Sequence, residues 1–157
     1  MSSNVTCPPG TGRSESASIG PMGGSLVVST ATGRFRLDVP PGALPRSTSV
    51  RVTEVARPTP VNYTDYSAIY ELSPVGLQLS QRARLEILWN FVLAPGPGFT
   101  SPPEVAIYGA NNPNGPWTVL EDSVIDAGSS IATSDRFGYV FVGYPASLDD
   151  PSCRRAP

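Results

Sequence analysis

The 157-residue sequence contains no histidine and no lysine. The lack of histidine excludes Ser-His-Asp and Cys-His catalysis and every histidine-ligated metal site. The lack of lysine excludes Schiff-base chemistry and the lysine of a Walker phosphate-binding loop. The formal net charge is −2, so there is no basic excess to neutralise the phosphates of a nucleic acid. We therefore expect no enzymatic activity, no cofactor and no nucleic-acid partner.

Long apolar runs are also missing. No stretch approaches the ~18 apolar residues of a membrane helix, so we expect no membrane span. No stretch of useful length has the period of an amphipathic helix. No signal peptide is recognisable, because Met1 is followed by the polar residues Ser2-Ser3-Asn4. This observation leaves a cytoplasmic location open.

Glycine and proline are abundant, with 15 and 18 residues spread between short alternating runs. The run from Arg34 to Val39 alternates apolar and polar residues, and a second alternating run follows at Thr48–Val52. Between them, Pro40 and Pro41 have no N–H to donate to a neighbouring strand, and Gly42 is able to turn the chain. This pattern predicts two strands joined by a rigid corner.

The same pattern recurs about every ten residues and is typical of a sandwich or barrel. We predict one antiparallel β-sandwich of immunoglobulin-like architecture with extended termini. Residues 1–19 are expected to form an arm or linker, residues 20–145 the sandwich and residues 146–157 a tail. The last strand is apolar on both faces and is expected to be central. The predicted strands are residues 25–29, 34–39, 48–52, 68–72, 82–89, 105–108, 117–120, 123–125, 130–133 and 137–144.

The strand at residues 82–89 has the clearest amphipathic pattern. Ala83, Leu85, Ile87 and Trp89 share one face, because side chains alternate with a period of two along a strand. We expect this face, including Trp89, to lie in the core.

Several short motifs resemble a known family. They are Gly23-Gly24 before the first strand, Val39-Pro40-Pro41-Gly42-Ala43-Leu44 after the second, Tyr70-Glu71-Leu72-Ser73-Pro74-Val75-Gly76, the strand ending at Trp89, and Gly115-Pro116-Trp117. Together they resemble the ZU-five domain shared by zonula occludens proteins, netrin receptors and ankyrins, in its bacterial form. The resemblance implies a β-sandwich that mediates protein contacts, often as one module of a larger protein.

Some members of that family cut their own backbone at a His-Phe-Ser triplet before the final strand. The equivalent triplet here is Arg136-Phe137-Gly138. Gly138 has no hydroxyl to attack the peptide bond, and Arg136 is unable to act as a base. A self-cleaving domain is therefore the least favoured function.

Five arginines occupy outward positions of predicted strands and form a candidate partner-binding patch if those strands are neighbours. Ankyrin-type members of the family use a basic surface to hold an acidic partner. The alternative, which we favour, is a solvated sheet face balanced by Asp38, Glu54 and Glu86, because exposed charges usually only keep a surface soluble. The five arginines are Arg34, Arg36, Arg51, Arg82 and Arg84.

Two further groups of residues are candidate sites. Tyr63, Tyr66, Tyr108 and Trp117 lie in or beside predicted loops, where they would stack on a sugar, anchor a partner, or plug the ends of the sandwich. Plugging is favoured, since large aromatic side chains are usually mostly buried. Acidic residues flank one predicted hairpin but lack the spacing of a calcium loop, so we expect no metal. These are Glu121, Asp122, Asp126 and Asp135.

The only cysteines, Cys7 and Cys153, lie outside the predicted sandwich at similar distances from the two ends. Domain termini often emerge close together, so we predict a disulfide between them, with free thiols or links between subunits as alternatives. A disulfide would place the chain in an oxidising compartment, hence outside the cell or on its surface.

These observations favour a non-catalytic interaction module of a surface-exposed or secreted bacterial protein, whose partner is another protein or a copy of itself. The alternative function is a structural subunit of a self-assembling extracellular or surface assembly.

Overall fold

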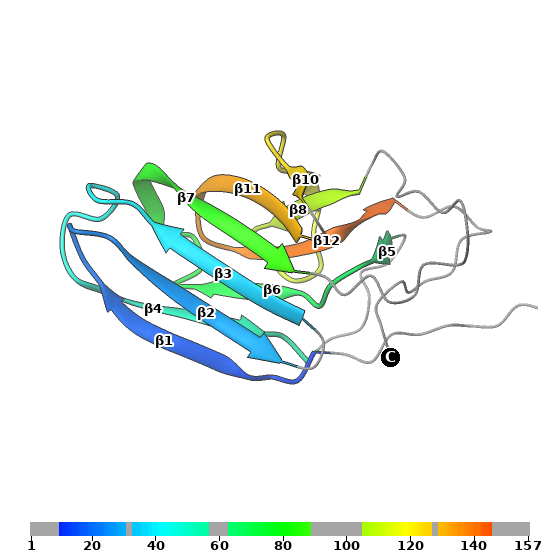
Figure 1. Cartoon of the computed structure of the whole chain (residues 1–157), viewed down its shortest axis with the longest axis horizontal. Coiled ribbons are helices and arrows are strands. Elements are labelled where there is room, and N and C mark those ends of the chain that lie inside the picture. The colour runs from blue at the N-terminus through cyan, green and yellow to red at the C-terminus, as the bar shows by residue number, and fades with distance from the viewer. Residues whose placement is uncertain (1–9, 31–32, 57–62, 89–104, 127–128, 146–157) are drawn as a thin grey trace, which may run out of the picture.

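The structure is a computed structural model that describes residues 10–30, 33–56, 63–88, 105–126 and 129–145 (Figure 1). The regular secondary structure of these residues consists of strands alone, arranged in two antiparallel sheets that pack face to face. The predicted β-sandwich is thus confirmed. No helix among the described residues has the length and apolar character needed to cross a membrane.

One sheet has five strands in the order β10-β11-β7-β3-β2. The inward side chains of β3 and of the second half of β7 are buried, because apolar residues alternate with polar ones along these segments. Phe35 and Leu37 lie opposite Ile87 and Leu85 in this core. The strands are β10 (Val124–Asp126), β11 (Ser129–Arg136), β7 (Gln78–Leu88), β3 (Gly33–Val39) and β2 (Gly24–Thr30).

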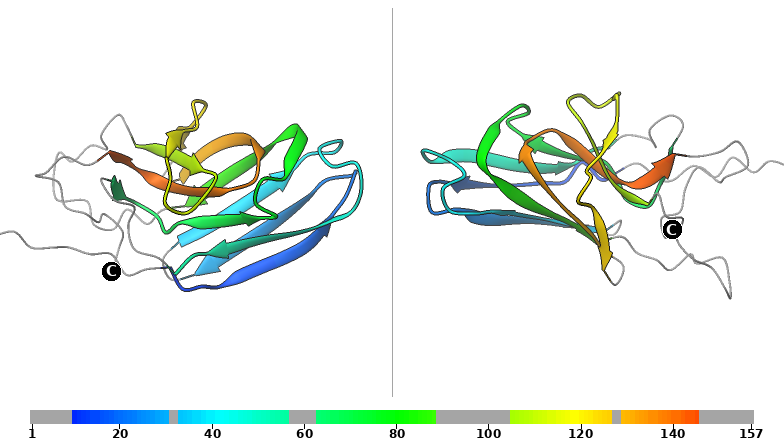
Figure 2. Two further views of the ribbon diagram at one scale, coloured as in Figure 1. Left: turned by 180° about the vertical axis from the view of Figure 1, so that it is seen from behind. Right: turned by 90° about the horizontal axis from the view of Figure 1, so that it is seen from above.

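The other sheet has seven strands, six of them in the order β1-β4-β6-β12-β8-β9, while β5 pairs with β12. Strand β12 is central, as predicted: Val140 and Val142 enter the main core, and Phe141 joins a second apolar cluster. Figure 2 shows the two layers from behind and from above. The strands are β1 (Ser14–Ile19), β4 (Thr48–Glu54), β5 (Tyr63–Asp65), β6 (Tyr70–Ser73), β8 (Ala106–Ala110), β9 (Thr118–Val119) and β12 (Tyr139–Pro145).

The proline corner carries the chain from β3 to β4, as the sequence predicts. Gly42 has a φ of 84°, and its N–H donates to the carbonyl of Pro21 at 2.8 Å. The corner therefore docks on the turn between β1 and β2. Gly23 in that turn has a φ of 78°, and a Cβ there would lie 2.3 Å from the carbonyl oxygen of Val39. The positive φ of both residues and the close approach of a carbonyl oxygen to Gly23 favour glycine at these positions.

The last six residues of the segment predicted as an arm form β1, which pairs with β4 from Ser14 opposite Thr53 to Ile19 opposite Thr48. Only Ala17 and Ile19 contribute apolar surface to the core, so the serine-rich composition concealed the strand. Trp89, Cys7 and Cys153 lie outside the described residues, so the burial of Trp89 and the disulfide stay predictions.

Candidate functional site

Four of the five predicted arginines lie on the outer face of the five-stranded sheet. Strands β3 and β7 are hydrogen-bonded neighbours, with Arg36 opposite Glu86 and Asp38 opposite Arg84. Arg51 is exposed on β4, in the other sheet, and does not belong to the patch. We call the remaining four residues, Arg34, Arg36, Arg82 and Arg84, the arginine face.

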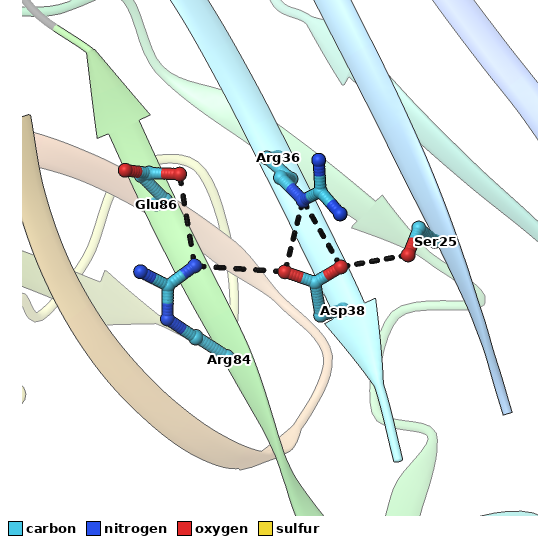
Figure 3. A network of polar contacts seen from close by, with 5 residues as sticks. All are labelled: Ser25, Arg36, Asp38, Arg84 and Glu86. Carbon is cyan, nitrogen blue, oxygen red and sulfur yellow. Dashed lines mark hydrogen bonds and ion pairs between the residues drawn. The ribbon is translucent and has the colours of Figure 1, made fainter. Parts of the chain in front are cut away.

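The centre of the arginine face is an ion-paired network around Asp38 (Figure 3). Arg36 Nε lies 3.0 Å from Asp38 Oδ2, and Arg84 Nη1 lies 3.6 Å from the same oxygen. Ser25 donates a hydrogen bond to Asp38 at 2.7 Å, and Arg84 also pairs with Glu86 at 3.6 Å. The network links β2, β3 and β7, so these side chains are held in place relative to one another.

The network shifts the ionisation of its central carboxyl group. Partial burial by itself would raise the pKa of Asp38, but hydrogen bonds from Arg36 and Ser25 and the charges of Arg36 and Arg84 outweigh it. The pKa of Asp38 is therefore held below its ordinary value. The hydrogen bond with Asp38 and its charge raise the pKa of Arg36. Asp38 is thus the anion on which two arginines converge.

Replacing Asp38 with asparagine should weaken the fold at neutral pH and reduce its sensitivity to acid. A carboxyl group whose folded pKa lies below its unfolded pKa stabilises the fold at higher pH, and this contribution is lost as pH falls through the folded pKa. The contribution should stay below about 1 kcal/mol, since solvent screens partly exposed ion pairs. Urea denaturation at pH 7 and pH 3 measures the effect, with exposed Asp135→Asn as the control. If the free energy of unfolding had the same pH dependence in Asp38→Asn and in the unchanged protein, this would contradict the predicted contribution of Asp38.

A second network joins the arginine face to the loop before β10. Arg82 Nε donates to Thr133 Oγ1 at 2.9 Å, and the amide and hydroxyl of Thr133 donate to the carboxylate of Asp122. Partial burial opposes ionisation of Asp122, but these hydrogen bonds, with help from Arg82, hold its pKa below the ordinary value. Arg34 makes no ion pair within the described ranges. Three of the four guanidinium groups thus interact with Asp38, Glu86 or Asp122, and most of the charge is balanced.

The expectation that Glu54 balances this surface is wrong. Its side chain is completely buried between the sheets, because Glu54 has the same inward orientation along β4 as Val50 and Val52. The carboxylate accepts hydrogen bonds from the Thr11 amide at 2.8 Å and the Thr30 hydroxyl at 2.6 Å. Glu54 therefore has a structural position and is not available on the surface.

The predicted aromatic candidates serve mainly as packing residues. Phe141 is fully buried on the outer side of the seven-stranded sheet, with the Trp117 ring at 4.9 Å, Tyr63 at 5.4 Å and Tyr108 at 5.9 Å. Tyr63 and Trp117 are half-buried and form the rim of this cluster. Tyr66 is buried elsewhere, in the main core. The cluster thus covers one face of a sheet. This differs from the predicted position of these side chains at the ends of the sandwich.

A pocket of about 310 Å³ opens between the β8–β9 turn and the β11–β12 turn. Its lining includes all three residues of the Arg136-Phe137-Gly138 triplet singled out in the sequence. A Cβ at Gly138 would lie 2.5 Å from the carbonyl oxygen of Ala110, so close approach of the two strands favours glycine there. The asparagine-rich turn that forms the other wall was interpreted from sequence only as a turn, and its contribution to a pocket was missed.

Acidic residues do not converge on a possible metal position in the described part of the chain, where no group of three or more His, Cys, Asp or Glu side chains has a suitable arrangement. No protein-family model matches the sequence, and no curated protein matches it significantly. The described surface offers arginine side chains on the five-stranded sheet and arginine and asparagine side chains beside the pocket.

Proposed function

We propose that the chain is a non-catalytic interaction module of a surface-exposed or secreted bacterial protein, of the ZU-five type. Its arginine face binds an acidic segment of a protein partner. The observation that supports this most directly is the gathering of four arginines on two neighbouring strands of one exposed sheet face. The exported location is proposed from the predicted pairing of Cys7 with Cys153.

The geometry of the arginine face suits carboxylate recognition. A guanidinium group is planar and presents a fork of N–H donors that matches a carboxylate. Arg36 and Arg84 already use this chemistry on Asp38, while Arg34 has no carboxylate partner within the described ranges. Arg34 and Arg82 lie on either side of the Asp38 network and are both exposed. An acidic segment laid across β3 and β7 would therefore meet positive charge on both sides of the neutral centre.

Binding to a defined acidic probe tests this function. The probe is a fluorescein-labelled ten-residue glutamate peptide with an amidated C-terminus, compared with a serine–glutamine peptide of equal length. We expect weak, salt-sensitive binding of the acidic peptide, because exposed charges are screened beyond about 8–10 Å at 0.1–0.15 M salt. Replacing Arg34 and Arg82 together with serine should weaken binding about tenfold, since each charge-assisted contact contributes about 1 kcal/mol or less at an exposed site.

The control is Arg51→Ser, which removes a charge that is also exposed but lies on the opposite sheet. It changes the net charge in the same direction but leaves the arginine face intact. Arg51→Ser should retain most of the affinity. Equal losses in both variants, or no preference for the acidic peptide, would show that the arginine face does not recognise acidic partners.

A further inference from the structure

The pocket between the β8–β9 and β11–β12 turns has room because a glycine forms part of its wall. Gly109 lies opposite Val140 in β12 and opposite Thr118 in β9. A Cβ at this position would meet Leu120, the Tyr139 carbonyl and Val140 at 3.5–3.8 Å, which are ordinary contact distances. The backbone thus tolerates a side chain at position 109, and glycine leaves that space open.

The pocket has two chemically different parts. Its apolar lining includes Leu120, Phe137 and Val140, and the last two are buried and belong to the main core. Its polar lining includes Arg136, Asn111 and Asn112, which are all exposed. A ligand that fills it therefore needs an apolar group beside a polar or anionic group.

Arg136 makes the polar side suitable for an anion. Its backbone is fixed by Ser134, whose hydroxyl donates to the Arg136 carbonyl at 2.8 Å and accepts from its amide at 3.2 Å. The ion pairs of the described residues do not involve its guanidinium group. Asn112 uses its side-chain oxygen to accept the Asn114 amide at 3.1 Å, which leaves its NH₂ group as a donor toward a ligand. Cation and amide donors together match a carboxylate.

We infer that this pocket binds the free C-terminus of a peptide or protein whose last residue is apolar. The terminal carboxylate meets Arg136 and the asparagine amides, and the last side chain enters the space beside Gly109. The volume is at the lower end of the ~300–1,000 Å³ range of ligand pockets, which suits one terminal residue. The pocket is open to solvent on one side, so the preceding residues of the ligand have a way out. This site shares no residue with the arginine face and goes beyond the function proposed above.

Titration with three small probes tests the inference. They are acetyl-Gly-Ser-Leu with a free carboxylate, the same tripeptide with a C-terminal amide, and free leucine. Amide chemical shifts from nuclear magnetic resonance report both affinity and location. The free-carboxylate peptide should bind and shift the signals of Gly109, Asn111 and Gly138. The amidated peptide should bind at least about tenfold more weakly, because a hydrogen bond to a charged group is among the stronger ones.

Two variants separate the polar and apolar parts. Arg136→Gln should weaken the free-carboxylate peptide about tenfold without affecting the fold, since the side chain is exposed. Gly109→Ala should weaken the leucine-terminated peptide more than an alanine-terminated one, because the added methyl group reduces the space for the last side chain. Arg51→Gln on the seven-stranded sheet is the charge-matched control and should change neither affinity.

Equal binding of the acid and amide peptides, or an unaltered affinity in Arg136→Gln, would overturn the assignment of the carboxylate. Free leucine binding as tightly as the peptide would overturn the assignment to a chain terminus. No shift at the pocket residues at millimolar peptide would overturn the site itself. None of these results depends on the oligo-glutamate assay, which uses an amidated probe and different arginines.

Discussion

Replacing Phe141 with alanine should lower the free energy of unfolding by about 3–5 kcal/mol, the usual range for deleting a buried large aromatic side chain. The side chain has no solvent exposure and lies among three other aromatic rings. Trp117 and Tyr63 meet it nearly at right angles, at 88° and 90° between ring planes, an edge-to-face arrangement that adds to the energy of burial. Loss of the ring would leave a cavity that these neighbours fill only in part.

Chemical denaturation followed by circular dichroism measures this effect. Phe141→Leu is the matched variant, because it keeps much of the apolar volume and should cost clearly less. Val119→Ala provides a surface control, since Val119 is 45% exposed on β9, the edge strand of the same sheet. A change of less than about 1 kcal/mol in Phe141→Ala would place this residue among ordinary surface substitutions. That result would contradict the burial of Phe141 in the second apolar cluster.

The two-sided burial of β12 shows how much of the fold the sequence reveals. The run from Phe137 to Tyr144 is apolar at consecutive positions, and only a central strand has both faces covered. The alternating runs of β3, β4 and β7 likewise predicted strands that the structure confirms, because period-two patterning and proline or glycine breaks are local properties. The short strand β5 (Tyr63–Asp65) was missed because it lies beside a proline-broken segment and pairs only with distant residues of β12.

The candidate sites depend on non-local arrangement, and here the sequence was less informative. The structure confirms that the side chains of Arg36 and Arg51 point outward, as predicted. Only the strand order shows that the two residues lie in different sheets. The pocket beside Gly109 needs two turns that approach each other in space although 20 or more residues separate them in the chain. No periodicity within either turn signals that meeting. Most strands were predictable, apart from β1 and β5, while the neighbours of each strand were not.

The error at Glu54 is of a different kind. The alternation along the strand indicated burial of this residue, whereas the charge of its side chain indicated exposure. Alternation from Val50 and Val52 places Glu54 on the inward side of β4. Its charge suggested exposure, because carboxylates are almost never fully buried unless partnered. The partners come from Thr11, Thr30 and Tyr70, which are separated from Glu54 by 43, 24 and 16 residues. They became visible only in the folded chain.

We expect Glu54→Ala to destabilise the fold by about 2–4 kcal/mol, because it removes the acceptor of one buried and two partly buried donors and leaves a cavity. The carboxylate links β4 to three other segments: the Thr11 amide donates at 2.8 Å, the Thr30 hydroxyl at 2.6 Å and the Tyr70 hydroxyl at 3.4 Å. The backbone of Glu54 also holds the residues directly before β1, donating to the Arg13 carbonyl and accepting from the Gly12 amide, both at 2.8 Å. The residue thus fastens the segment before β1 to the sandwich.

The matched variant is Glu54→Gln, which keeps the size of the side chain and one oxygen acceptor. The Thr30 hydroxyl is able to reorient and accept from the new NH₂ group, so Glu54→Gln should lose less stability than Glu54→Ala. Hydrogen exchange gives a local readout: the amide of Thr11 should exchange faster in Glu54→Ala, because it loses its side-chain acceptor, while the β12 amides change only as far as global stability falls. If Glu54→Ala were as stable as the unchanged protein and Thr11 exchange were unaltered, Glu54 would not hold the segment before β1. Faster exchange at Thr11 in Glu54→Ala, with partial protection in Glu54→Gln, would assign that fastening to the side-chain carboxylate, because both variants keep the backbone hydrogen bonds to Gly12 and Arg13.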